Sequence, residues 1–399
     1  MQGEPTVGLY VHVPFCERIC PYCDFAVVAA RRLGPEREDR YIDALLAELE
    51  RRAPDFAGHS LASLYLGGGT PSLLRPESVR RVIEEAQRHF APLAPVEITL
   101  EVNPSSVERE RLPAFRAAGV GRLSIGIQSF DDTRLQRLGR AHKAEEGRRT
   151  LAAARAAGFD NVSLDLLFAG PAPQAEPGGE ASEVLLDRDL DATLEFGPEH
   201  VSAYELTLEA GTPFAAAAQA GVLRLPDEET AAALIERVEE RLTAAGYERY
   251  EISSYARPGF RAVHNQRYWL RAPVLGIGMG AWSSEPPSPG APHGVRRANS
   301  RQLETYLERV ESGRSPAGEP EPLTPAIARG EAVFLSLRRR EGLAAAGFAA
   351  EFGAPPRHFF APAIEALTEA HLLTESTDGD LTLTARGRML SDSVFAHFV

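Results

Sequence analysis

The chain has 399 residues, of which 44% are hydrophobic and 25% are charged, and its formal net charge is −13. This composition is that of a folded protein with a sizeable core, and the length suits one large domain and one small one. The acidic balance disfavours nonspecific binding to nucleic acid, and no uncharged apolar run of about 18 residues predicts a transmembrane segment. Peripheral membrane association stays open.

A first strand is predicted at residues 8–13, and all three cysteines of the chain follow it, at Cys16, Cys20 and Cys23. Three thiolates without a fourth can hold three irons of a [4Fe-4S] cluster and leave the fourth iron open to a cofactor. An odd, tightly spaced trio does not suit disulfides. A structural zinc site is the alternative, with His12 completing the four ligands it needs. We expect a cytoplasmic protein without a secretory leader.

Short β-branched runs alternate with amphipathic stretches over the first half of the chain. The predicted strands are residues 8–13, 63–66, 96–101, 122–127, 161–168 and 200–205. Predicted helices between them include residues 40–52, 77–90 and 145–157. This order predicts an α/β fold with a parallel sheet, curved into a partial (β/α)6 barrel, and functional residues are expected where its strands end.

Polar or glycine-rich features follow nearly every predicted strand. These strand-end features include Gly68, Gly69, Thr70, Glu101, Gln128 and Asp165. Glycines let the backbone approach a ligand, carboxylates and amides accept hydrogen bonds from ribose hydroxyls, and Arg140 can bind a carboxylate with both arms of its guanidinium. Each feature also has a structural explanation: a tight turn, a helix cap or a solvated charge.

The cysteine run, with Tyr22 before its last cysteine, resembles the signature of radical S-adenosylmethionine (radical SAM) proteins. Residues 10–16, 67–72, 101–104, 124–130, 138–142 and 204–212 resemble the oxygen-independent coproporphyrinogen III oxidase group over most of the chain. The resemblance implies a [4Fe-4S] cluster on Cys16, Cys20 and Cys23. It assigns S-adenosylmethionine to Tyr10, Tyr22, Gly68, Gly69, Thr70, Glu101, Gln128, Arg140 and Asp165.

Two branches of this group differ in function. The oxidase has a further cysteine where this chain has Phe25, and a long N-terminal segment for which we expect no room here. The Cys-Asp-Phe sequence at 23–25 and the His-Asn-x-x-Tyr-Trp sequence at 264–269 resemble instead the HemW family of heme chaperones, which lack oxidase activity. This resemblance implies heme binding and heme transfer to respiratory heme proteins. Oxidation of coproporphyrinogen III is the alternative, so enzymatic activity stays open.

His264 is the candidate heme ligand in this second sequence. Its imidazole can supply an axial nitrogen to iron, with Tyr268 and Trp269 packed on the porphyrin. Without the resemblance, a hydrogen-bonded structural histidine explains the same residues. We expect His12 to be structural or a neighbour of the cofactor.

We divide the chain into a radical SAM barrel at residues 1–250, a connecting region at 251–323 with proline-rich linkers, and a C-terminal domain at 324–399. Within the barrel, a Pro- and Gly-rich loop at 169–180 replaces a short turn of the family, and we expect it to be mobile. The C-terminal domain is predicted to be helix-rich, with helices at 326–339, 343–352 and 357–370 and a hairpin about Asp378-Gly379, and to resemble a winged helix. The acidic charge argues against DNA binding there.

Overall fold

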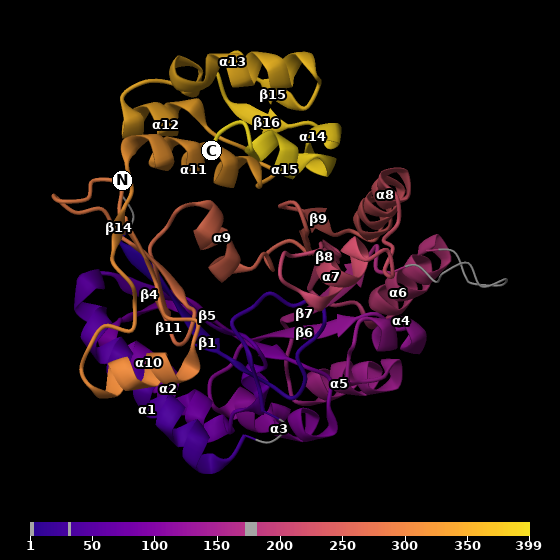
Figure 1. The fold of residues 1–399 in the computed structure, drawn as a ribbon, viewed down its shortest axis with the longest axis vertical. Helices are drawn as coiled ribbons and strands as arrows, with labels where there is room; N and C mark the ends of the chain where they lie inside the picture. The colour runs from indigo at the N-terminus through magenta and orange to yellow at the C-terminus, as the bar shows by residue number, and fades with distance from the viewer. Residues whose placement is uncertain (1–3, 31–32, 172–181) are drawn as a thin grey trace.

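The computed structural model describes residues 4–30, 33–171 and 182–399. A mainly parallel sheet of β14-β13-β12-β11-β1-β4-β5-β6-β7-β8-β10-β9 forms its main body (Figure 1). Its central strands run parallel in chain order: β1 (Thr6–Val13), β4 (Ser60–Gly68), β5 (Pro92–Val102), β6 (Arg122–Gln128), β7 (Val162–Phe168) and β8 (His200–Glu205). These are the six predicted strands, so the partial barrel is confirmed. The predicted mobile loop lies almost entirely outside the described residues.

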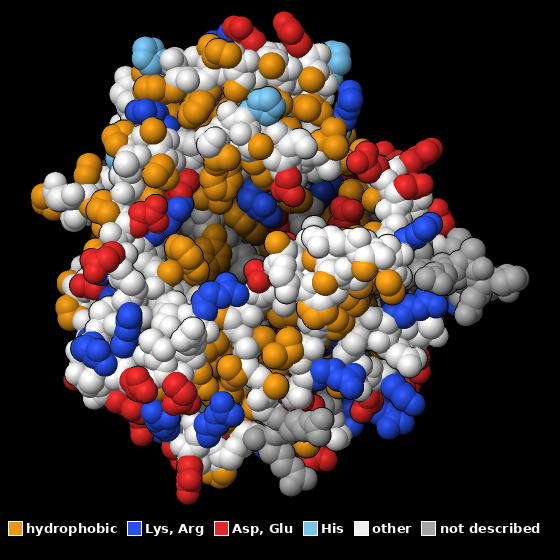
Figure 2. All heavy atoms as spheres, viewed as in Figure 1, with side chains coloured by type: hydrophobic (Ala, Val, Ile, Leu, Met, Phe, Trp, Pro, Cys, Tyr) orange, Lys and Arg blue, Asp and Glu red, His pale blue; other side chains and the backbone are white. Residues whose placement is uncertain are grey.

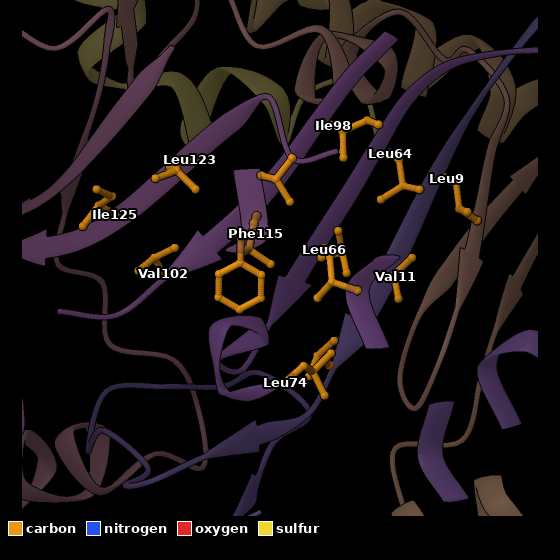
Figure 3. Packing of buried hydrophobic residues seen from close by; sticks show 14 of the residues in the cluster. Leu9, Val11, Leu64, Leu66, Leu74, Ile98, Val102, Phe115, Leu123 and Ile125 are labelled. Carbon is orange, nitrogen blue, oxygen red and sulfur yellow. The ribbon is translucent and has the colours of Figure 1, made fainter. Parts of the chain in front are cut away.

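Each central strand has an apolar face against the helices and a polar face toward the barrel interior. Successive side chains of a strand point to opposite faces, so the pattern is a period of two. Along β6 the buried apolar set is Leu123, Ile125 and Ile127, and the set lining the interior is Arg122, Ser124, Gly126 and Gln128. Figure 3 shows the apolar side chains of neighbouring strands gathered on one side of the sheet, with Phe115 of helix α3 (Ser106–Ala117) among them. Their burial fixes the register and leaves the inner face free for polar residues.

Helices cover the outer face of the sheet. They are α1 (Pro35–Arg52), α2 (Pro76–His89), α3 (Ser106–Ala117), α4 (Asp132–Arg137), α5 (Ala144–Ala156), α6 (Ser182–Phe196) and α8 (Glu228–Ala244). The predicted helices correspond to α1, α2 and α5. Side-chain caps begin several of them: Ser105 accepts a hydrogen bond from the Glu108 N–H at α3, and Asp227 accepts one from the Thr230 N–H at α8.

Short strands extend the sheet at both ends, and the sequence did not predict them. β11 (Val274–Ile277) pairs parallel with β1 and is followed by antiparallel β12 (Trp282–Glu285), β13 (Val295–Ala298) and β14 (Glu321–Pro322). At the other end, β10 (Ser254–Ala256) and β9 (Glu248–Arg249) follow β8. Five short strands of the predicted connecting region, β10 to β14, therefore belong to the main sheet. Strands of two to four residues are too short to show a periodic pattern.

The C-terminal part has its own hydrophobic core, which includes Val333, Phe348 and Leu381. It consists of α11 (Pro325–Leu337), α12 (Ala345–Phe352), α13 (Pro356–Glu369), the hairpin β15 (Leu373–Glu375) and β16 (Leu381–Leu383), α14 (Ala385–Met389) and α15 (Ser391–Phe395). The helix-rich arrangement with its hairpin agrees with the prediction. Helix α9 (Val263–Trp269) lies between this part and the barrel (Figure 1), where the molecular surface is hollowed (Figure 2).

No helix among the described residues is long and apolar enough to cross a membrane.

Candidate functional site

The polar inner faces of the strands line a cavity of about 640 Å³. This volume lies within the usual range of small-molecule sites, roughly 300–1,000 Å³. The cavity begins at the cysteine loop (residues 14–25) and runs along β6 from Gln128 to Arg122. The structure thus brings together most of the predicted site residues: Cys16, Cys20, Tyr22, Cys23, Gly68, Gly69, Thr70, Glu101, Gln128, Arg140 and Asp165.

The three thiols are free and half-buried at the mouth of this cavity. The Thr70 hydroxyl donates to the Cys16 sulfur at 3.8 Å, and Arg140 Nη1 donates to the Cys20 sulfur at 3.7 Å. Burial raises the pKa of the Cys16 thiol to about 11, so the metal-free thiol is protonated at neutral pH. Hydrogen bonds to sulfur stabilise the thiolates that iron binding requires.

The donor set suits a multi-iron cluster better than a single zinc ion. Among the described residues, no three Cys, His, Asp or Glu side chains converge closely enough to hold one ion. His12, the candidate fourth zinc ligand, uses both ring nitrogens in hydrogen bonds, to the Tyr10 hydroxyl at 3.0 Å and to the Ala26 carbonyl at 2.8 Å. A four-iron cluster spreads its thiolates over separate irons, and three free cysteines fit that demand.

Distant parts of the chain position the cysteine loop. The Phe214 N–H donates to the Pro21 carbonyl at 3.0 Å, and Arg301 donates to the Asp24 carbonyl at 2.6 Å. Gly139 packs so closely on Pro21 that a Cβ at this glycine would lie 2.5 Å from the proline Cδ. The loop geometry is therefore set by tertiary contacts as well as by its own sequence.

Two half-buried carboxylates lie deeper in the cavity. Glu101 accepts hydrogen bonds from the Tyr65 hydroxyl at 2.8 Å and from the Gly68 N–H at 3.0 Å, and Asp165 accepts from the Ser124 hydroxyl at 3.1 Å. Gly68 has a φ of +107°, which favours glycine at this close approach. Burial raises the pKa of both carboxyls, that of Glu101 to about 7. Their oxygens can accept further hydrogen bonds, as ribose hydroxyls would require.

The raised pKa of Glu101 predicts a pH-dependent stability. A buried carboxyl with a raised pKa contributes stability below its unfolded pKa, near 4.5, and loses that contribution as the pH rises through about 7. Glu101→Gln cannot ionise. Its free energy of unfolding relative to wild type is therefore expected to increase between about pH 5 and about pH 8, by on the order of 1–3 kcal/mol. Urea denaturation of the metal-free proteins at both pH values measures this difference.

Glu84→Gln is the matched control, because Glu84 lies exposed on α2, where it pairs with Arg80. This variant is expected to show a much smaller change across the same pH range. Equal pH profiles for the two variants would contradict the assignment to Glu101.

Two predicted site residues lie outside the cavity lining. Tyr10 lies behind Tyr65, with ring centroids 6.2 Å apart. His264 is 1% exposed, with its ring nitrogens 2.9 Å from the Ser63 hydroxyl and 3.0 Å from the Tyr268 hydroxyl. Burial lowers the pKa of His264 to about 3, so its ring is neutral. Coordination of iron by His264 would require one of these hydrogen bonds to break, and its role as a heme ligand stays a prediction.

Several lining residues were not predicted from the sequence. They are chiefly Tyr65, Asn103, Arg122, Ser124, Ser202, Tyr204 and Asn265. Arg122 and Ser124 occupy alternate positions of the predicted strand 122–127, in phase with Gln128, and Ser202 and Tyr204 alternate in the same way along the predicted strand 200–205. The period of two along each strand was the signal that could have identified them.

Comparison with known proteins places this geometry in a family. Residues 10–176 match the radical SAM superfamily, and residues 323–390 match the HemN C-terminal domain. The heme chaperone HemW of Mycobacterium tuberculosis is 36% identical over 398 residues, covering 99% of this chain and 95% of its own length. That of Bacillus subtilis is 31% identical, covering 98% of each chain.

A solved structure has the same fold over nearly the full length. The coproporphyrinogen III oxidase HemN of Escherichia coli, described as a radical SAM enzyme, matches with a TM-score of 0.81 and 25% identity. The match covers 99% of this chain and 90% of that one. With the extent of the sequence similarity, these findings show that the chain belongs to the HemW family of the radical SAM superfamily.

Proposed function

We propose that the protein is a heme chaperone that binds a [4Fe-4S] cluster, S-adenosylmethionine and heme, and transfers heme to respiratory heme proteins. Membership of the superfamily implies the cluster and the S-adenosylmethionine. The observation that carries the heme proposal is similarity along almost the whole chain to proteins named heme chaperone HemW. Phe25, where the oxidase has a cysteine, agrees with this branch.

The cysteine end of the cavity would hold the cluster and its cofactor. The three cysteines would bind three irons, while Thr70 and Arg140 would donate hydrogen bonds to two of the sulfurs. When bound, the cluster and S-adenosylmethionine together supply one-electron chemistry. The acceptors on Glu101, Gln128 and Asp165 would orient the ribose, and Tyr22, Gly68 and Gly69 complete the proposed set at the cavity. Tyr10 lies behind Tyr65, and its part in cofactor binding rests on the family resemblance alone.

Exposed apolar side chains at the cavity support a porphyrin ligand. Phe25 is 68% exposed, Ile19 45% and Tyr204 41%, and all three line the cavity. Large exposed aromatic and aliphatic side chains around a pocket are typical of binding sites, and the flat apolar face of a porphyrin matches them. We propose that these side chains contact the heme ring.

Two assays on the same protein distinguish the heme chaperone function from the oxidase function. Anaerobically reconstituted protein is expected to bind heme in an absorbance titration. It is also expected to form no protoporphyrinogen from coproporphyrinogen III with S-adenosylmethionine and a reductant. Formation of protoporphyrinogen would refute the chaperone proposal in favour of the oxidase. Transfer is tested by following recovery of the heme spectrum of a heme-free respiratory cytochrome mixed with the heme-loaded protein.

His264→Ala tests the proposed axial ligand separately. If His264 coordinates iron, its loss is expected to shift the heme absorbance bands and weaken binding by about 10-fold or more. Tyr268→Phe is the matched control, because it removes only the hydroxyl that bonds the His264 ring. Unchanged spectra and affinity in His264→Ala would leave the chaperone proposal in place and remove this ligand from it.

We also propose that the protein acts in the cytoplasm, with peripheral contact to the membrane that holds its respiratory acceptors. Free thiols that ligate a cluster are maintained in a reducing compartment.

A further inference from the structure

Arg122 is a buried cation at the inner end of the cavity, and it has no hydrogen-bond partner in the part of the chain that the structure describes. The residue is 2% exposed, yet its side chain lines the cavity. Its Nε atom is buried and unpaired, and Arg122 forms no ion pair with any residue that the structure describes. An unsatisfied buried donor destabilises the folded chain, and a charged one does so more strongly. An unpaired buried guanidinium that faces a cavity indicates a binding site for a ligand that is not part of the chain.

The strand pattern places Arg122 in the cavity. As the first residue of β6 it shares the inward face with Ser124 and Gln128, while Leu123 and Ile125 between them pack in the hydrophobic core. The guanidinium is therefore held in the barrel interior by the same register that buries the apolar face. It lies at the end of the strand opposite Gln128 and the cysteine loop.

The two carboxylates whose pKa values Arg122 affects already accept hydrogen bonds from uncharged donors. Glu101 accepts from Tyr65 and Gly68, and Asp165 accepts from Ser124. The charge of Arg122 lowers the pKa of both carboxyls, but their burial outweighs this effect and raises both. The guanidinium thus retains hydrogen-bonding capacity that its internal neighbours do not use.

The other titratable groups whose pKa values are affected by the charge of Arg122 carry no negative charge at neutral pH. Burial and the charge of Arg122 lower the pKa of His200 and of His264, so both rings are neutral. Burial raises the pKa of Tyr65 and of Tyr250, so both phenols keep their protons. A guanidinium in such surroundings favours a carboxylate, which it can bind with two parallel hydrogen bonds.

We infer that Arg122 binds a carboxylate of the ligand that enters the inner part of the cavity, and, resting on the proposed heme function, that this group is a heme propionate. S-adenosylmethionine also has a carboxylate, but we place that group at the open iron of the cluster, at the cysteine end of the cavity. Asn265, from the segment at residues 264–269, lines the same cavity and offers an amide to the same ligand. Arg122 would thus recognise the propionates of heme and not the heme iron.

The test compares heme with heme dimethyl ester, in which both propionates are blocked. Wild-type reconstituted protein is expected to bind heme about 10- to 100-fold more tightly than the ester. In Arg122→Met the ratio of the two affinities is expected to fall toward one. Arg122→Lys keeps the charge but lacks the planar guanidinium with its two parallel donors, and its ratio is expected to be intermediate. Arg149→Met is the matched control, because Arg149 lies exposed on α5, paired with Glu145. It is expected to keep the wild-type ratio.

Each outcome decides the inference. A wild-type ratio near one would overturn it without any variant, as would an unchanged ratio in Arg122→Met with normal iron and sulfide content. Equilibrium dialysis with S-adenosylmethionine distinguishes the two sources of carboxylate. If Arg122→Met binds S-adenosylmethionine 10-fold more weakly but keeps the wild-type preference for heme over its dimethyl ester, the propionate assignment is overturned. If wild type binds no heme, the proposed function fails. The S-adenosylmethionine measurement then decides whether Arg122 binds a carboxylate at all.

Discussion

Cys20→Ser is expected to lose most of its bound iron and sulfide after anaerobic reconstitution, where wild type retains about four of each per chain. The serine oxygen is a poor ligand for a soft iron–sulfur site, and no other cysteine in the chain can replace the missing one. The substitution also removes the sulfur that accepts a hydrogen bond from Arg140. Iron and sulfide analysis with the visible absorbance spectrum measures the effect.

The fold of this variant is expected to survive, because the three cysteines are only half-buried and lie outside the hydrophobic core. Far-ultraviolet circular dichroism should therefore match that of wild type. Stoichiometric zinc without sulfide in the wild-type protein would refute the cluster assignment and revive the zinc alternative.

Gly139→Ala is expected to reduce cluster occupancy several-fold without changing any proposed ligand. Gly139 has a φ of +70°, and a Cβ there would meet the ring of Pro21 at 2.5 Å from Cδ and 3.2 Å from Cγ. The proline ring is bonded to its own backbone nitrogen and cannot rotate away. The cysteine loop therefore has to move, and its thiols move with it.

Gly158→Ala separates this clash from the cost of the backbone conformation. Gly158 has a similar φ of +82°, but a Cβ there meets no atom within 4 Å. Both variants are expected to lose about 1–2 kcal/mol of stability from the left-handed conformation. Only Gly139→Ala is expected to lose iron and sulfide. Equal cluster content in the two variants would show that the Pro21 contact does not position the loop.

The sequence predicted the central architecture because its signals there are local. Each parallel strand is a run of β-branched and apolar residues long enough to recognise, and each is separated from the next by a helical stretch with an apolar face. Since the carboxyl ends of parallel strands meet at one edge of a sheet, strand-end residues such as Thr70, Glu101 and Gln128 were expected to lie together, and they line one cavity.

His264 shows what local sequence signals leave open. Its sequence neighbours suggest a ligand on a loop, but its environment comes from residues far away in the chain. Glu97 of β5 accepts hydrogen bonds from the N–H groups of Val263 and His264, both at 2.9 Å, and so holds the start of α9 against the barrel. Ser63 of β4 then occupies one ring nitrogen. No pattern around residue 264 contains this information.

Sequence alone thus determined the parallel barrel, the cluster-type cysteine trio and the family resemblance, since each depends on spacing along the chain. Tertiary structure alone decided that β11 to β14 complete the sheet, that His264 is enclosed and that Arg122 is unpaired inside the cavity. These features depend on which distant residues meet across the barrel. Burial and hydrogen-bond satisfaction are properties of that packing, and a single segment does not encode them.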